Sequence, residues 1–170
     1  PEHLKPGANV ATNVYHTLNT YKRFPSLVEY STNSISKDGK GAGSFRNNSN
    51  NIFNFVATKT DIFQLASGTF TSRKGSLTGT DADYFTFTQF GNFVIASNGV
   101  DAPQYYEMGT STNFANLSSI VTAGSLPIFR VSGVVRDFLV TGNQPSNQNR
   151  IQWSGINDIT TWQGKQADFQ

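Results

Sequence analysis

Three phenylalanine-centred apolar segments recur along this chain at similar intervals. The segment around Phe53 is followed 40 residues later by one around Phe93, and 45 residues after that by one around Phe138. The last two, GNFVIASNG (91–99) and RDFLVTGNQ (136–144), both place apolar residues directly before a turn rich in Ser, Thr, Gly and Asn. A period of about 40–50 residues with several short strands is typical of β-propeller blades, because one blade cannot cover both of its own faces.

The composition favours strands over helices. Only 14% of the residues are charged, 14 are Phe, and Gly, Asn, Ser and Thr are abundant. No window shows apolar residues at the i, i+3, i+4, i+7 spacing of an amphipathic helix. We therefore predict an all-β fold with about three propeller-like blades, and a β-sandwich of about eight to ten strands stays open as the alternative. The strands expected from the pattern are 52–58, 62–66, 93–97, 104–108, 129–131, 137–141 and 150–153.

The first part of the chain has a different character. Pro6, Gly7 and Pro25 interrupt regular structure over residues 1–34, which we interpret as an extended arm with one or two short strands that lies against another surface. KDGKGAGSFRNNSNN (37–51) is predicted to be a loop. The expected division is an arm and loop over residues 1–45 and a blade region over residues 46–170. The candidate assembly residues of the arm are Tyr15, Tyr21, Phe24, Pro25 and Tyr30.

Charge and cysteine content exclude several classes of protein. The net charge is only +2, and the adjacent basic pairs, Lys22-Arg23 and Arg73-Lys74, form no stripe of the kind that a sequence-reading nucleic-acid binder uses. The chain has no cysteine, which excludes disulfides and thiolate sites and favours assembly in the cytoplasm. The apolar runs are too short to span a membrane, and no signal peptide is recognised.

No set of residues forms a recognisable catalytic, cofactor or metal site. The two histidines, His3 and His16, both fall in the arm, and Asp81-Ala-Asp83 lacks the further oxygen ligands of a calcium loop. Gly39, Gly41 and Gly43 do not have the spacing of a phosphate-binding loop. Paired carboxylates for glycoside hydrolysis are not singled out among the 11 acidic residues. We therefore predict that the protein is not an enzyme and needs no cofactor or metal.

Both tryptophans lie in RIQWSGINDITTW (150–162), around a Ser-Gly turn and an Asn-Asp pair. We predict a structural corner in which Trp162 folds back onto its own turn, because Asn and Asp side chains start turns through bonds to the backbone. The alternative is a stacking platform of two exposed tryptophans for a sugar or a base. The candidate corner residues are Trp153, Ser154, Gly155, Asp158 and Trp162.

This corner and the arm together resemble the tail nozzle, or tail tubular, proteins of short-tailed bacteriophages. The arm motif of that family, a Gly-Tyr-x-x-x-Pro type, corresponds here to Thr20–Pro25, and its Trp-Ser-x-x-x-Asp-x-x-x-Trp corner to Trp153, Ser154, Asp158 and Trp162. The family's usual proline after the Asp is Ile159 here. The resemblance spans nearly the whole chain, which would be the N-terminal part of a longer protein.

The resemblance implies a structural virion protein that forms a homo-oligomeric ring, a hexamer, below the portal and adaptor proteins of a phage tail. Such a ring would extend the DNA channel and retain packaged double-stranded DNA until ejection, without sequence-specific binding. A carbohydrate- or receptor-binding β-module is the alternative function. Because three blades are too few to close a propeller, we also expect the chain to be a fragment.

Overall fold

The computed structural model describes residues 12–18, 20–25, 28–162 and 166–168. The chain divides into two compact units, Pro1–Tyr30 and Ser31–Gln170, which are described separately below.

The first unit is a β-hairpin in the part that is described. Strands β1 (Val14–Thr17) and β2 (Thr20–Arg23) pair antiparallel, with Val14 opposite Arg23 and Thr17 opposite Thr20. The Thr17 hydroxyl donates a hydrogen bond of 2.8 Å to the Thr20 carbonyl, which ties the two strands at the turn. The expectation of one or two short strands in this segment is confirmed.

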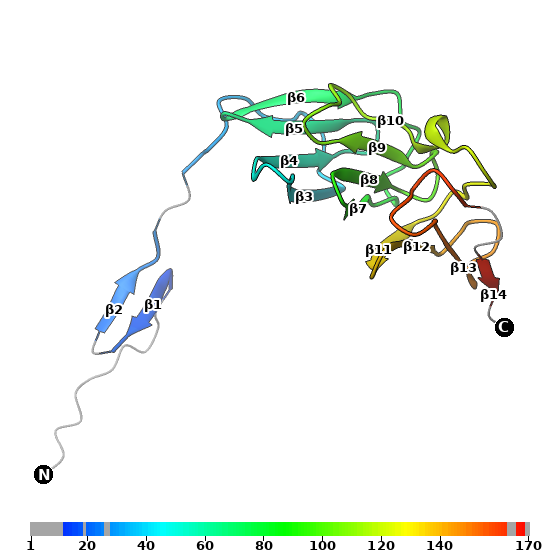
Figure 1. Cartoon of the computed structure of the whole chain (residues 1–170). Helices are drawn as coiled ribbons and strands as arrows, with labels where there is room; N and C mark the ends of the chain where they lie inside the picture. The colour runs from blue at the N-terminus through cyan, green and yellow to red at the C-terminus, as the bar shows by residue number, and fades with distance from the viewer. Residues whose placement is uncertain (1–11, 19, 26–27, 163–165, 169–170) are drawn as a thin grey trace, which may run out of the picture. The chain divides into compact units, whose positions relative to one another are not determined.

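The second unit is built from three four-stranded antiparallel sheets, each connected in simple sequence order (Figure 1). A short 3-10 helix, η1 (Leu117–Ile120), follows the second sheet. The first sheet contains β3 (Gly41–Arg46), β4 (Ile52–Ala57), β5 (Ile62–Ala66) and β6 (Thr69–Lys74). The second contains β7 (Thr86–Phe90), β8 (Phe93–Ser97), β9 (Gln104–Glu107) and β10 (Ala115–Asn116), and the third contains β11 (Val131–Val135), β12 (Phe138–Gly142), β13 (Arg150–Trp153) and β14 (Gln166–Asp168).

The registers of the three sheets repeat. In the first sheet Gly41 pairs with Ala57, in the second Thr86 pairs with Ser97, and in the third Val131 pairs with Gly142. The first strands therefore begin 45 residues apart, and Phe53, Phe93 and Phe138 occupy equivalent positions on the second strands. The first strands are also neighbours in space, because β7 contacts both β3 and β11. The predicted all-β fold and its three repeats of short strands are confirmed.

The second sheet lies between the other two and buries both of its faces (Figure 1). One face contributes Val94, Ala96 and Tyr106 to a core shared with Phe55 of the first sheet. The other face contributes Phe90 and Ile95 to a second core. That second core also holds Leu117, Phe129, Leu139, Ile159 and Trp162. Alternation along each strand places successive side chains on opposite faces, so one strand serves both cores.

Two of the expected elements differ from the structure by more than one residue. The prediction of a loop over residues 37–51 was wrong for Gly41–Arg46, which forms β3 and pairs with β4 along its whole length. Glycine marks a close approach at this strand, because a Cβ on Gly41 would lie 2.4 Å from the Phe85 carbonyl oxygen. The strand expected over 129–131 instead runs from Val131 to Val135, and Phe129 is fully buried in the second core ahead of it.

Candidate functional site

The corner after β13 begins with Ser154, which continues the pairing of the third sheet beyond the end of the strand. Its backbone N–H donates to the Leu139 carbonyl at 3.0 Å, and its hydroxyl oxygen accepts from the Leu139 N–H at 3.1 Å. The hydroxyl also donates to the Gly155 carbonyl at 2.8 Å, and the residue is fully buried. The backbone N–H and the hydroxyl of Ser154 are therefore both engaged in fixing the corner.

Asp158 holds the turn that follows. Its Oδ1 accepts hydrogen bonds from the Thr160 N–H at 2.8 Å and the Thr160 hydroxyl at 2.6 Å, and its Oδ2 accepts from the Thr161 hydroxyl at 2.7 Å. Gly155 closes the turn by donating its N–H to the Thr161 carbonyl at 2.7 Å. Hydrogen bonds from Thr160 and Thr161 hold the pKa of the Asp158 carboxyl below its usual value. The predicted Asx-type turn is confirmed.

Trp162 folds back onto this turn, as predicted. Its indole N–H donates to the Ile159 carbonyl at 2.8 Å, and its backbone N–H donates to the Ala123 carbonyl at 2.8 Å. Only 1% of the residue is exposed, and Ile159, at the position where the resembling proteins carry proline, is 3% exposed in the same core. Trp162 therefore anchors the corner to the second core.

The two tryptophans do not form a stacking platform. Trp153 is half-buried, and it pairs with Val140 on the face of the third sheet that points away from the second sheet. Trp162 is buried within the core on the other side. A stacking platform needs two exposed aromatic faces on one surface. The alternative prediction of a platform formed by Trp153 and Trp162 together was therefore wrong.

We expect Asp158→Ala to lower the free energy of unfolding by about 1–2 kcal/mol at neutral pH, because it removes the acceptor of three hydrogen bonds. Since the folded-state pKa of Asp158 lies below the ordinary value of 3.8, this contribution is present above pH 3.8 and is lost as the pH falls through the folded value. Urea unfolding of wild type and variant from pH 7 to pH 3 measures the difference. Asp137→Ala, at an exposed position, is the control and should change stability little. An equal effect of both variants, or a constant difference across the pH range, contradicts the prediction.

The candidate assembly residues of the arm carry exposed aromatic side chains. Tyr15 is 44% exposed, Tyr21 58%, Phe24 57% and Tyr30 71%. Tyr15 and Phe24 pack edge to face, with ring centroids 6.2 Å apart, and the Phe24 N–H donates to the Asn13 carbonyl at 2.7 Å. Pro25 is exposed as well and follows the hairpin directly. Three of these exposed rings, those of Tyr15, Tyr21 and Phe24, lie on or directly beside the two-stranded hairpin.

The acidic pair Asp81 and Asp83 does not form a cation site. Asp83 is 7% exposed and accepts hydrogen bonds from the Thr80 N–H and hydroxyl at 2.9 and 2.7 Å, which lower the pKa of its carboxyl. Asp81 is exposed and forms an ion pair of 3.1 Å with Lys59. Asp81 therefore lies on a surface turn, as expected, whereas Asp83 is buried and also forms an ion pair of 3.3 Å with Arg130. Within the described ranges no three His, Cys, Asp or Glu side chains come together as a metal-binding group, and His3 lies outside these ranges.

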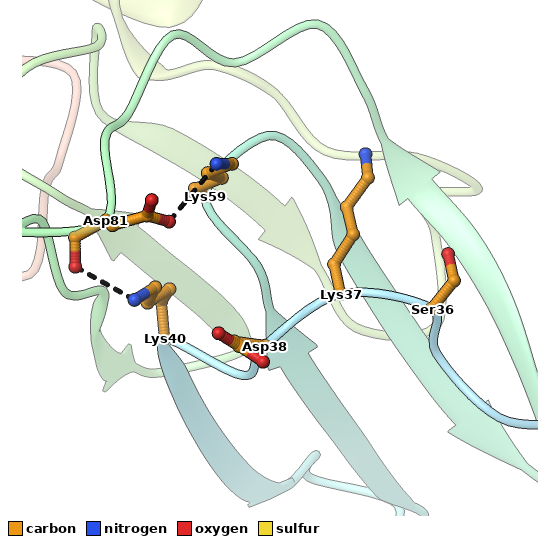
Figure 2. A pocket seen from close by; sticks show the side chains of 6 residues that line it. All are labelled: Ser36, Lys37, Asp38, Lys40, Lys59 and Asp81. Atoms are coloured by element: carbon orange, nitrogen blue, oxygen red, sulfur yellow. Dashed lines mark hydrogen bonds and ion pairs between the residues drawn. The ribbon is translucent and has the colours of Figure 1, made fainter.

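A charged hollow of about 290 Å³ lies where the chain enters β3 (Figure 2). Its lining is mainly lysine and aspartate, and each lysine already has an acceptor. Lys40 donates to the Asp81 carbonyl at 2.8 Å, Lys59 pairs with the Asp81 carboxylate, and Lys37 pairs with Asp61 at 2.6 Å. Partial burial acts to raise the pKa of Asp61, but hydrogen bonds from Lys37 and Thr60 hold it below its usual value. The hollow is a network of surface ion pairs.

Sequence reasoning placed turns after the second strand of two sheets but missed the side-chain hydrogen bonds that hold them. After β4, the Asp61 N–H donates to the Thr58 hydroxyl at 3.1 Å. After β8, Asn98 accepts from the Val100 and Asp101 N–H groups at 3.0 and 2.9 Å, and Asp101 accepts from the Thr78 N–H at 3.0 Å. The signal was a Thr or Asn three residues before an Asp at equivalent places in two repeats.

No protein-family model, curated protein or solved structure matches the chain. Among the described residues, no helix is long and apolar enough to cross a membrane.

Proposed function

We propose that the protein is a structural component of a phage tail. It forms a homo-oligomeric ring, a hexamer, that extends the DNA channel below the portal and adaptor proteins and retains packaged DNA until ejection. The three sheets are consecutive blades of a propeller, the arm of residues 1–34 makes the contact with a neighbouring subunit or the adaptor, and the protein performs no catalysis. It assembles in the host cytoplasm and resides in the virion.

The arrangement of the first strands supports the propeller. Blades of a propeller are four-stranded antiparallel meanders arranged radially around a central channel, so the innermost strands of successive blades are neighbours. Here the three sheets are such meanders, and β7 lies beside both β3 and β11. The Thr88 hydroxyl of β7 donates to the Ser132 carbonyl of β11 at 3.0 Å, which fixes the spacing of two first strands.

The corner at Arg150–Trp162 is the observation that carries the proposed function. It is the part of the chain that most resembles the tail proteins, and its side chains are engaged in holding the third sheet together. Ser154, Asp158 and Trp162 all make internal hydrogen bonds. Because the residues of this corner stabilise the fold, the corner supports a structural role. The burial of Trp162 counts against the alternative of a carbohydrate-binding module.

A low charge suits a conduit through which DNA must move. Each phosphate contact made by Lys or Arg releases counterions and holds the DNA more tightly, so a channel for passage should make few of them. The chain carries 13 basic and 11 acidic residues, and in the hollow of Figure 2 the lysines are neutralised by carboxylates or bonded to a carbonyl. The proposed ring therefore surrounds DNA without gripping it.

The proposal predicts weak DNA binding and arm-dependent assembly. We expect a labelled duplex of about 30 base pairs to bind the chain with a shallow dependence of affinity on salt, measured by fluorescence anisotropy.

The double variant Tyr21→Ser/Phe24→Ser should fold normally, because both side chains are exposed. It should fail to form rings with or without the portal and adaptor, as judged by light scattering and negative-stain microscopy. Tight and steeply salt-dependent binding, or normal rings from the variant, would count against the proposal.

A further inference from the structure

The face of the third sheet that points away from the second sheet is apolar and uncovered. We name it the outward face; Val131 and Val135 on it are 46% and 59% exposed, and Ile151 is 37% exposed. It contains a hollow of about 280 Å³. Its residues, taken from the pairing register, are Val131, Gly133, Val135, Phe138, Val140, Ile151 and Trp153. None of these seven residues is charged, which is uncommon for a sheet face that stays in water.

The repeat shows what the same face does in the other two sheets. Phe55, Ile95 and Val140 are equivalent in register, and the first two are 1% and 0% exposed because the following sheet covers them, whereas Val140 is only half-buried. Likewise Phe90 is 7% exposed, and its equivalent Val135 is 59% exposed. The outward face is therefore built like an interface between sheets, and no described sheet of residues 31–168 covers it.

The first sheet presents the complementary surface. Sheets two and three each turn one face towards the sheet before them, through Val94 and Ala96 in one case and Leu139 and Thr141 in the other, all of them buried. The equivalent residues of the first sheet are Asn54 and Val56, which are half-buried, with Ala42 exposed beside them on β3. We name this the leading face. No four-stranded sheet precedes it in the described part of the chain.

We propose that the outward face of one molecule binds the leading face of a second copy of this chain. The contact continues the packing that already joins the first sheet to the second and the second to the third. Two copies joined in this way at both ends provide six sheets, within the range of about four to eight blades that close a propeller. A head-to-tail contact of this kind closes into a ring when its rotation permits.

The register identifies the central contact. Within the chain, Thr88 Oγ1 lies 2.9 Å from Ser132 Oγ, and this pair joins the first strands of the second and third sheets. One repeat further on, Thr88 corresponds to Gly133 and Ser132 corresponds to Ala42, so Gly133 of one copy faces Ala42 of the other. A Cβ on Gly133 would meet nothing within 4 Å in its own chain, so no intramolecular contact there requires a glycine.

Disulfide trapping in the full chain tests the proposal, because the natural sequence has no cysteine. We expect Gly133→Cys and Ala42→Cys variants, mixed and oxidised with glutathione disulfide, to form a covalent dimer, while either variant alone forms much less. Thr88→Cys/Ser132→Cys is the matched control and should form the corresponding bond within one chain.

Self-association supplies a second measurement on the same protein. Light scattering from about 1 to about 200 µM should show wild type reaching at least twice its monomer mass, and Gly133→Arg should weaken association about a hundredfold, since an unpaired guanidinium is strongly disfavoured in an apolar contact. A mixture of Gly133→Arg and Ala42→Arg should recover pairing, because each retains one intact face. Monomeric wild type, trapping by Gly133→Cys alone, or capture of a different protein on the outward face would overturn the proposal. It involves residues 31–168 and not the arm, so it stands or falls independently of a role in a phage tail.

Discussion

Trp162→Ala is expected to cost more stability than any other single truncation considered in this chain, about 3–5 kcal/mol of the free energy of unfolding. Among the described residues it is the largest fully buried side chain, and its removal leaves a cavity in the second core, which also holds Leu139, Phe129 and Ile159. It also leaves the Ile159 carbonyl without its donor. Because domains of this size have about 5–15 kcal/mol in total, the loss takes a large part of the stability. Urea unfolding followed by far-UV circular dichroism measures it.

Two further substitutions, Trp162→Phe and Trp153→Phe, test whether the loss of stability comes from the buried position of Trp162. Trp162→Phe keeps most of the packing and loses the hydrogen bond to Ile159, so it should cost about 1–2 kcal/mol and remain folded enough to measure. Trp153→Phe changes a half-buried residue on the outward face and should cost about 1 kcal/mol or less in the monomer. Equal losses at Trp153 and Trp162 would contradict the distinction between a surface residue and an anchor.

The strands that could be predicted from the sequence are those with a local signal. The predicted limits of β5, β8 and β13 agree with the structure, because each is an apolar or alternating run that stops at turn residues such as Asn98-Gly99 or Ser154-Gly155. The repeat itself was visible because Phe53, Phe93 and Phe138 keep one register position. These features depend on neighbours within a few residues, which is the range over which sequence patterns are informative.

β3 and the outward face could not be predicted, because both depend on residues that are far apart in the sequence. Gly41 of β3 lies close to Phe85, a residue 44 positions later in the sequence, and no local sequence pattern indicates such a contact. At the corner, the sequence indicated a turn at Asp158 but not its threonine partners. The exposure of Val135 indicates an uncovered interface only when it is compared with the burial of Phe90, the equivalent residue of the second sheet. The strand register of both sheets is needed to recognise that the two residues are equivalent.

Gly41→Ala is the second substitution with a large expected effect, and it tests how closely the first two sheets approach. The added methyl group would lie 2.4 Å from the Phe85 carbonyl oxygen and 2.9 Å from its Cβ, and neither backbone can give way without moving a strand. The Phe85 N–H also donates to the Lys40 carbonyl at 2.8 Å, so separation of the two strands would break this bond. We expect a loss of about 1–3 kcal/mol, measured by urea unfolding.

Gly133→Ala is the matched control, since Gly133 occupies the equivalent strand of the third sheet, where a new Cβ meets nothing within 4 Å. Removing a glycine from a strand restricts the unfolded chain, so this variant should be neutral or more stable by about 0.5 kcal/mol when measured at concentrations where the protein is monomeric. A loss of stability at Gly133 as large as that at Gly41 would mean that the glycines share a requirement of the strand itself. A loss of stability at Gly41 alone identifies the contact with the following sheet as the cause. Gly133 has no such contact within its own chain, and for the same reason the outward face is open to a partner.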